Sequence, residues 1–167
     1  DIFVAMTAAA MKTSRIHLAT GMLIPSNRSA PVAANALASL ARLAPGRVEL
    51  GIATGFTARR SMGLGPIKMA ALAEYVRVVT GLLAGETVEW GVEGQRRKIR
   101  FLNPELGQID ISRPIPLHVS ALGPKMRAYA ASLGAAFVQP CRPGRPSANS
   151  VNRTPRRACI GGSYLRQ

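Results

Sequence analysis

The chain has 167 residues, of which 47% are hydrophobic and 18% charged, as in one globular domain rather than a disordered or fibrous protein. Its apolar runs are far shorter than the roughly 20 residues of a membrane-spanning helix, so no such helix is expected. The formal charge of +14 would favour a polyanionic partner, but it is unevenly spread: residues 141–167 hold 6 arginines and no acid.

The first predicted unit alternates strand and helix. Residues 15–20 form a strand candidate ended by Gly21, and Pro31 opens a helix whose apolar positions recur at helical spacing until Pro45 and Gly46 stop it. The next strand follows at once, over residues 48–54. This order indicates a βαβ unit with parallel strands.

A second and a third unit repeat the pattern. After a glycine-rich loop, Pro66 opens a helix with an apolar stripe that ends near Gly85. A strand over 115–121, a turn at Gly123 and Pro124, a helix ended by Gly134 and a strand over 135–138 come later. Residues 86–114 interrupt the alternation and are expected to form an insertion, a β-hairpin lying over one end of the sheet. Its basic run, Arg96 to Lys98, is of the kind that is usually solvated.

The alternation predicts an α/β fold, either an open doubly wound sheet or a (β/α)8 barrel. A complete barrel needs about 250 residues, so about four strands would make a partial one. The domain is expected to span 1–139. The tail, 140–167, has no apolar periodicity and is broken by proline and glycine, which predicts disorder and is consistent with a frameshifted end.

Cysteine content and the start of the chain indicate the compartment. Cys141 and Cys159 are too few for a disulfide framework or a four-ligand zinc site. The chain starts at Asp1 with no basic and apolar leader. We therefore expect a cytoplasmic protein without a signal peptide or a metal site.

Ordered motifs along residues 2–138 carry a resemblance to a known family. They are Ile16 to Met22, Arg28 and Pro31, Leu50 to Gly55, Glu74 to Val76, Leu82 to Glu86, and Ile115 to Met126. Together they resemble the bacterial luciferase-like superfamily of flavin- or deazaflavin-dependent oxidoreductases, most closely its methylenetetrahydromethanopterin reductase branch. The resemblance implies a partial (β/α)8 barrel without the first two and last two strands, so this chain alone is expected to be an inactive fragment.

The resemblance also implies a cofactor site at the carboxyl ends of the strands. Thr20, Gly21 and Met22 would form a bulge with a non-prolyl cis peptide bond that backs the isoalloxazine ring, the missing Cβ of Gly21 making the bulge tolerable. The alternative is an ordinary glycine at a strand end. Ala53, Thr54 and Gly55, which only partly match the family's glycine-rich version, would line the polar edge of the ring.

A phosphate loop is predicted on physical grounds as well. Small residues between a strand and a helix N-terminus leave backbone N–H groups for an anion in the field of the helix dipole. This pattern occurs at Ser120, Ala121, Leu122 and Gly123, where the Ser120 hydroxyl could add a bond. The alternative is a bare turn before a helix-starting proline.

No catalytic acid or base is assigned, because such residues are expected outside this chain. His17 and His118 lie mid-strand between apolar residues and are interpreted as structural. The resemblance implies hydride transfer or oxygen activation with coenzyme F420, or with FMN as second choice, on a small-molecule substrate. A homo-oligomer is possible for the full-length form. The competing hypothesis is a small basic α/β protein that binds nucleic acid through its tail and the run from Arg96 to Lys98.

Overall fold

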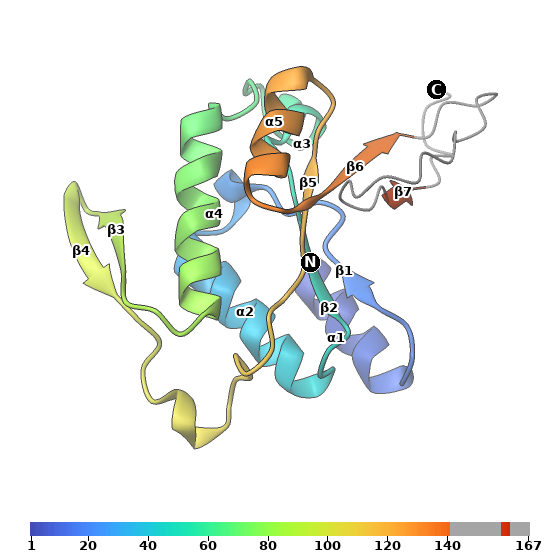
Figure 1. Ribbon diagram of the computed structural model, residues 1–167, viewed down its shortest axis with the longest axis vertical. Coiled ribbons are helices and arrows are strands. Elements are labelled where there is room, and N and C mark those ends of the chain that lie inside the picture. Colours follow the sequence, from blue (N-terminus) through green and yellow to red (C-terminus); the bar gives the residue numbers. More distant parts are fainter. Residues whose placement is uncertain (141–157, 161–167) are drawn as a thin grey trace. The chain divides into compact units, whose positions relative to one another are not determined.

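The computed structural model describes residues 1–140 and 158–160 (Figure 1). The chain divides into two compact units, Asp1–Pro116 and Leu117–Gln167.

The first unit opens with a helix that the sequence pattern does not predict. Helix α1 (Ile2–Lys12) begins at Asp1, whose carboxylate caps it by accepting a hydrogen bond from the Phe3 amide at 2.8 Å. It buries Phe3, Met6 and Ala10 and contacts α2 and β1. Its remaining faces are also largely apolar, so the sequence shows no amphipathic stripe there.

Two parallel strands form the centre of this unit. Strand β1 (Leu18–Ala19) pairs with β2 (Val48–Ile52), Leu18 beside Val48 and Ala19 beside Glu49. β1 is shorter than the expected strand over 15–20. Its pairing resumes at Leu23, opposite Ile52.

Two long helices pack on each other in this unit. They are α2 (Ala30–Leu43), with a proline in its first turn, and α4 (Met69–Leu83). Helix α2 appears where Pro31 and the apolar spacing predict it, although Leu43 at its end is exposed. Helix α4 begins three residues after Pro66, the residue expected to open it, and Lys68 is its N-cap. The unit also has three short helices. They are η1 (Pro25–Asn27) between β1 and α2, α3 (Phe56–Arg60) between β2 and α4, and η2 (Pro104–Leu106) near the end of the unit. The loop predicted over 55–66 therefore contains α3.

The expected hairpin in the 86–114 segment is present. Strands β3 (Val88–Val92) and β4 (Gln95–Ile99) pair antiparallel, with Trp90 opposite Arg97. Its placement differs from the expectation, because β3 contacts α4 and Figure 1 shows the hairpin beside that helix, away from β1 and β2. Val88 is buried and lies close to Gly81 of α4, where an added Cβ would come within 2.5 Å of the Val88 Cγ1.

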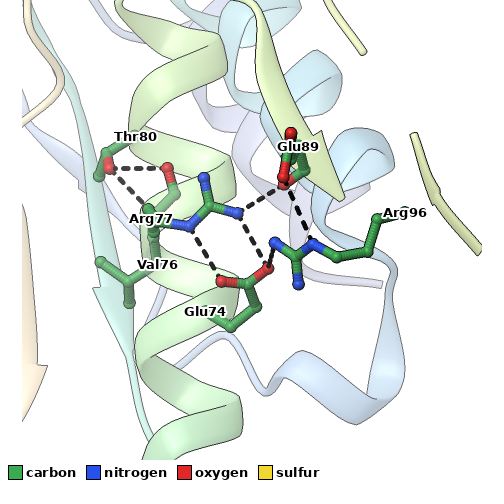
Figure 2. Close-up of polar contacts among 6 residues, drawn as sticks. All are labelled: Glu74, Val76, Arg77, Thr80, Glu89 and Arg96. Carbon is green, nitrogen blue, oxygen red and sulfur yellow. Dashed lines mark hydrogen bonds and ion pairs between the residues drawn. The ribbon is translucent and has the colours of Figure 1, made fainter. Parts of the chain in front are cut away.

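A charged network fixes the hairpin to α4 (Figure 2). The Arg77 guanidinium donates two hydrogen bonds of 2.9 Å to Glu74 and one to the Glu89 carbonyl. Arg96 of β4 pairs with Glu74 at 3.2 Å and with Glu89 at 3.5 Å. The basic run is thus partly engaged in specific ion pairs.

The second unit is also built from parallel strands. Strand β5 (Leu117–Ser120) leads into α5 (Pro124–Ser132), which returns to β6 (Ala136–Pro140) beside β5, with His118 opposite Ala136. Strand β7 (Ala158–Ile160) pairs with β6 in parallel. At these three residues the structure differs from the expected disorder, and the rest of the predicted tail, 141–157 and 161–167, lies outside the described residues. Within the described residues, no helix is long and apolar enough to cross a membrane.

Candidate functional site

The carboxyl end of β1 carries a β-bulge. Between the pairs Ala19 with Glu49 and Leu23 with Ile52, β1 advances four residues while β2 advances three. One extra residue therefore sits on β1, which interrupts the ladder and turns the chain locally. The bulge falls at Thr20, Gly21 and Met22, where the sequence predicts the ring-backing segment.

The Thr20 hydroxyl replaces the missing ladder contacts. Its side chain is only 1% exposed, and its Oγ1 donates to the Gly51 carbonyl at 2.7 Å and accepts from the Gly51 amide at 2.9 Å. Backbone pairing then resumes, with the Leu23 amide donating to the Gly51 carbonyl at 2.8 Å and the Ala53 amide to the Leu23 carbonyl at 3.1 Å. Thr20 thereby satisfies a buried amide that the bulge would leave unpaired.

Gly51 is a component of this site that the sequence pattern does not assign. A Cβ on Gly51 would lie 2.1 Å from the Thr20 carbonyl oxygen and 2.8 Å from the Met22 sulfur. The bulged segment therefore packs directly on the backbone of β2, which requires glycine there. An isolated glycine inside a strand pattern is the signal that could have indicated this close approach.

Gly21, unlike Gly51, has open space around its Cβ position. The peptide bond between Gly21 and Met22 is cis, which confirms that expectation. The residue is exposed, and a Cβ added to it would meet no atom within 4 Å. Beyond the two adjoining residues, no described atom explains a glycine here, and the expected steric role of the missing Cβ within the bulge itself stays a prediction.

Residues 53–55 lie next to the bulge, at the carboxyl end of β2. Ala53 and Thr54 are half-buried, and the Thr54 carbonyl accepts from the Ile67 amide at 3.0 Å. Gly55 has φ +80° and begins α3, and a Cβ there would lie 2.5 Å from a methyl group of Ile24. Gly55 is thus explained by backbone conformation and packing. The structure brings residues 20–22 and 53–55 together at one end of the β1–β2 pair.

The predicted phosphate loop belongs to the second unit. Ser120 ends β5, and Gly123 is the N-cap of α5 with φ −111° and open space at its Cβ position. The Ala121 amide already donates to the Val138 carbonyl at 3.2 Å, which corrects the expectation that it is available for an anion. The exposed Leu122 accepts a hydrogen bond from Arg127 through its carbonyl.

The two histidines lie elsewhere. His17 precedes β1 at its amino end, and its exposed ring places Nδ1 2.8 Å from the Glu49 carboxylate. His118 is half-buried inside β5. Across the part of the chain that the structure describes, no three His, Cys, Asp or Glu side chains gather closely enough to hold a metal ion.

Electrostatics around the site favour an anion. Residues 50–73, which follow the bulge's partner strand, contain Arg59, Arg60 and Lys68 but no acid. In the second unit, taken by itself, residues 117–140 contain Lys125 and Arg127 but no acid. Acidic groups with a lowered pKa lie outside these segments: Glu74, held by its hydrogen bond from Arg77, and Asp110, held by Ser112. Residues 20–22 and 53–55 carry no titratable side chain, so they can bind and orient a ligand rather than transfer its protons.

Comparisons with known proteins identify relatives. The chain is 34% identical over 146 residues to the F420-dependent glucose-6-phosphate dehydrogenase of Beutenbergia cavernae, which covers 83% of this chain and 41% of that protein. It is 30% identical over 128 residues to the 5,10-methylenetetrahydromethanopterin reductase of Methanolobus tindarius, covering 75% and 37%. The chain thus spans about two fifths of the length of these relatives.

Solved structures show the same fold. The monooxygenase RslO1 of Streptomyces bottropensis superposes with a TM-score of 0.68 at 27% identity, over 84% of this chain and 43% of that one. The F420-dependent tetrahydromethanopterin reductase of Methanopyrus kandleri does so with 0.64 at 24%, over 83% and 44%. The expected partial (β/α)8 barrel is confirmed. The family model described as "Luciferase-like monooxygenase" matches residues 1–154, and the chain therefore belongs to the luciferase-like monooxygenase family.

Proposed function

We propose that this chain supplies a cofactor-binding part of an oxidoreductase that uses coenzyme F420, with FMN as second choice, on a small-molecule substrate. F420 is named first because it appears in the names of relatives at 34% and 35% identity. Oxidation, reduction and oxygenation of the substrate all remain within the proposal, since relatives of each kind match this chain.

The observation that carries the proposal is the open surface over Gly21. The bulge is anchored from behind by Thr20 and Gly51, through two hydrogen bonds and a backbone contact that leaves no room for a side chain. On its other side, Gly21 is exposed and nothing lies within 4 Å of its Cβ position. A flat ring can therefore rest against the peptide backbone at Gly21, at the strand ends where barrels bind their ligands.

The second unit, taken by itself, carries the candidate phosphate loop. Both F420 and FMN carry phosphate groups, and in the proposal the amides of Leu122 and Gly123 and the N-terminus of α5 receive one of them. Open space at the Gly123 Cβ position and the absence of acids in residues 117–140 support this assignment. When bound, the ring would supply hydride transfer or oxygen activation.

The protein residues have binding and orienting roles in this proposal. Thr20 holds the bulge, Gly21 presents the contact surface, and Ala53, Thr54 and Gly55 line the adjoining edge. We assign no catalytic acid or base to the chain. A cytoplasmic location, supported by the low cysteine content, and a homo-oligomeric full-length form belong to the same proposal.

Cofactor titration of a matched pair of glycine variants tests the proposal. Gly21 and Gly91, the latter in β3, both have open space at the Cβ position and no positive φ, so alanine fits the protein at either place. We expect G21A to raise the Kd for F420 and FMN at least tenfold, about 1.4 kcal/mol, with an unchanged unfolding temperature. G91A should bind like the wild type.

A third variant addresses the phosphate loop. Replacing Gly123 with valine should also weaken binding at least tenfold, because the side chain would occupy the space of the anion. Equal affinity of G21A and wild type would refute the ring site, and equal affinity of G123V would remove the loop from it. Failure of the wild-type protein to bind either cofactor would refute the proposal as a whole.

A further inference from the structure

We infer that the loop of residues 54–67, here called the α3 loop, binds an amphipathic anion, a small molecule with an apolar body and a carboxylate or phosphate group. This inference rests on the proposed function and deepens it, because it assigns a chemical class to the substrate. The loop leaves the carboxyl end of β2 next to residues 53–55 and the bulge.

The α3 loop is held in shape by its own hydrogen bonds. The Ile67 amide donates to the Thr54 carbonyl at 3.0 Å and so joins the two ends. Inside the loop, the Leu64 amide donates to the Arg59 carbonyl at 2.9 Å, and the Arg59 side chain donates to the Gly65 carbonyl. Compact loops with joined ends and internal contacts are frequently functional. Residues on this loop are therefore positioned before any ligand arrives.

Three apolar side chains of the α3 loop are about half exposed. Phe56 is 58% exposed, Met62 51% and Leu64 48%. The main buried core of the same unit is formed by other residues, such as Leu37, Leu50 and Leu72. Three large apolar side chains within nine residues of one loop are thus exposed, and covering them with a ligand would be favourable.

A cation lies on the same face as the aromatic ring. Phe56 and Arg60 are four residues apart in α3, so their side chains lie on one side of the helix, and both are exposed. Arg59 is already engaged with Gly65, whereas Arg60 and Lys68 extend the positive charge of the loop. With no acid between residues 50 and 73, this apolar surface is complementary to a ligand that carries a negative charge.

The hairpin, the other basic stretch of this unit, offers a contrast. Its Arg96 is bound by the carboxylates of Glu74 and Glu89, and β3 places Glu89 directly opposite Lys98. The charge of Arg96 is therefore compensated locally. The hairpin supplies a matched position for a control variant, since Arg97 is exposed like Arg60 but lies on β4.

Three probes test the inference on the full chain: the anionic fluorophore 8-anilinonaphthalene-1-sulfonate, the neutral fluorophore Nile red, and inorganic phosphate. We expect saturable binding of the anionic fluorophore that is weakened at least fivefold by R60Q and by F56A. R97Q and L102A, the latter at a highly exposed apolar residue, should leave it unchanged. R60Q should spare Nile red, F56A should weaken it, and phosphate alone should bind no more tightly than in the millimolar range.

Several results would overturn the inference. They are equal binding of the anionic fluorophore by wild type and R60Q, an equal loss in R97Q, or an effect of R60Q on Nile red as large as on the anion. Should R60Q lower the unfolding temperature, K68Q and F56A are measured in its place, and the same loss is required of them. Cofactor binding that depends on Gly21 without an effect of Arg60 refutes this inference alone. An effect of Arg60 on the probe without any cofactor binding refutes the proposed function alone.

Discussion

Replacing Thr20 with valine tests how much the Thr20 hydroxyl contributes to stability, because valine has nearly the same size and shape. Valine retains the branched shape but loses the donor to the Gly51 carbonyl and the acceptor for the Gly51 amide. The carbonyl keeps a partner, because the Leu23 amide donates to it at 2.8 Å. The amide loses the partner that the structure gives it at a fully buried position.

The expected cost follows from these two losses. A typical hydrogen bond contributes about 1 kcal/mol net, and a buried donor without a partner costs about 1 to 3 kcal/mol. T20V should therefore lower the free energy of unfolding by about 2 to 4 kcal/mol. For a chain of this size, each kcal/mol corresponds to roughly 2 to 4 °C in Tm, so Tm should fall by about 5 to 15 °C.

The control is T20S, which keeps the hydroxyl and loses one methyl group, at a cost of about 0.8 kcal/mol. Urea unfolding followed by circular dichroism gives both values on the full chain. We expect T20S to be clearly more stable than T20V. If T20V proves as stable as T20S, the hydroxyl does not hold the bulge and the argument for its anchoring fails.

Two further predictions concern close packing and pH. G51A should destabilise the protein by about 3 kcal/mol or more, beyond ordinary overpacking, because its Cβ would lie 2.1 Å from the Thr20 carbonyl oxygen; an unfolding curve like that of the wild type would contradict this contact. The hydrogen bond from Arg77 lowers the pKa of Glu74 below its ordinary 4.5, so its stabilisation is complete above that pH and is lost as the pH falls through the folded-state pKa. Since Glu74 is partly exposed, E74Q should cost under about 1 kcal/mol at pH 7, and the difference from the wild type in urea midpoints should vanish near pH 2; a difference that grows on acidification would refute the sign.

The sequence predicts the parts of the fold that depend on the spacing of apolar residues and on prolines and glycines at the ends of elements. Helix α2 has Pro31 in its first turn as expected, whereas α4 begins three residues after Pro66. Each helix has a buried stripe of apolar side chains, as the spacing predicts. Helix α1 is not predicted because its sequence, IFVAMTAAAMK, is apolar on nearly every face. Only its contacts with α2 and β1 select which side is buried.

The details of the site depend on contacts between strands. The bulge is visible only when β1 is paired with β2, since neither strand alone shows that one advances four residues against three. The placement of the hairpin beside α4 depends in the same way on contacts between separate segments: Arg77 of α4 reaches the Glu89 carbonyl, and Arg96 of the hairpin reaches Glu74. The local sequence pattern predicts that the hairpin forms, but it does not predict that the hairpin packs against α4.

The glycines of the candidate site show what the structure adds to the sequence. In the sequence they look alike, as glycines at strand ends and in turns. The structure separates them by what a Cβ would meet: Gly51 and Gly55 are required by Thr20, Met22 and Ile24, whereas the Cβ positions of Gly21 and Gly123 face open space with ordinary φ. A glycine that the chain's own described atoms explain carries no information about a ligand. Among the four glycines of the candidate sites, the two that these atoms do not explain are those that the resemblance and the helix N-terminus assign to the ring and the phosphate. Alanine or valine at these two positions therefore tests the function rather than the fold.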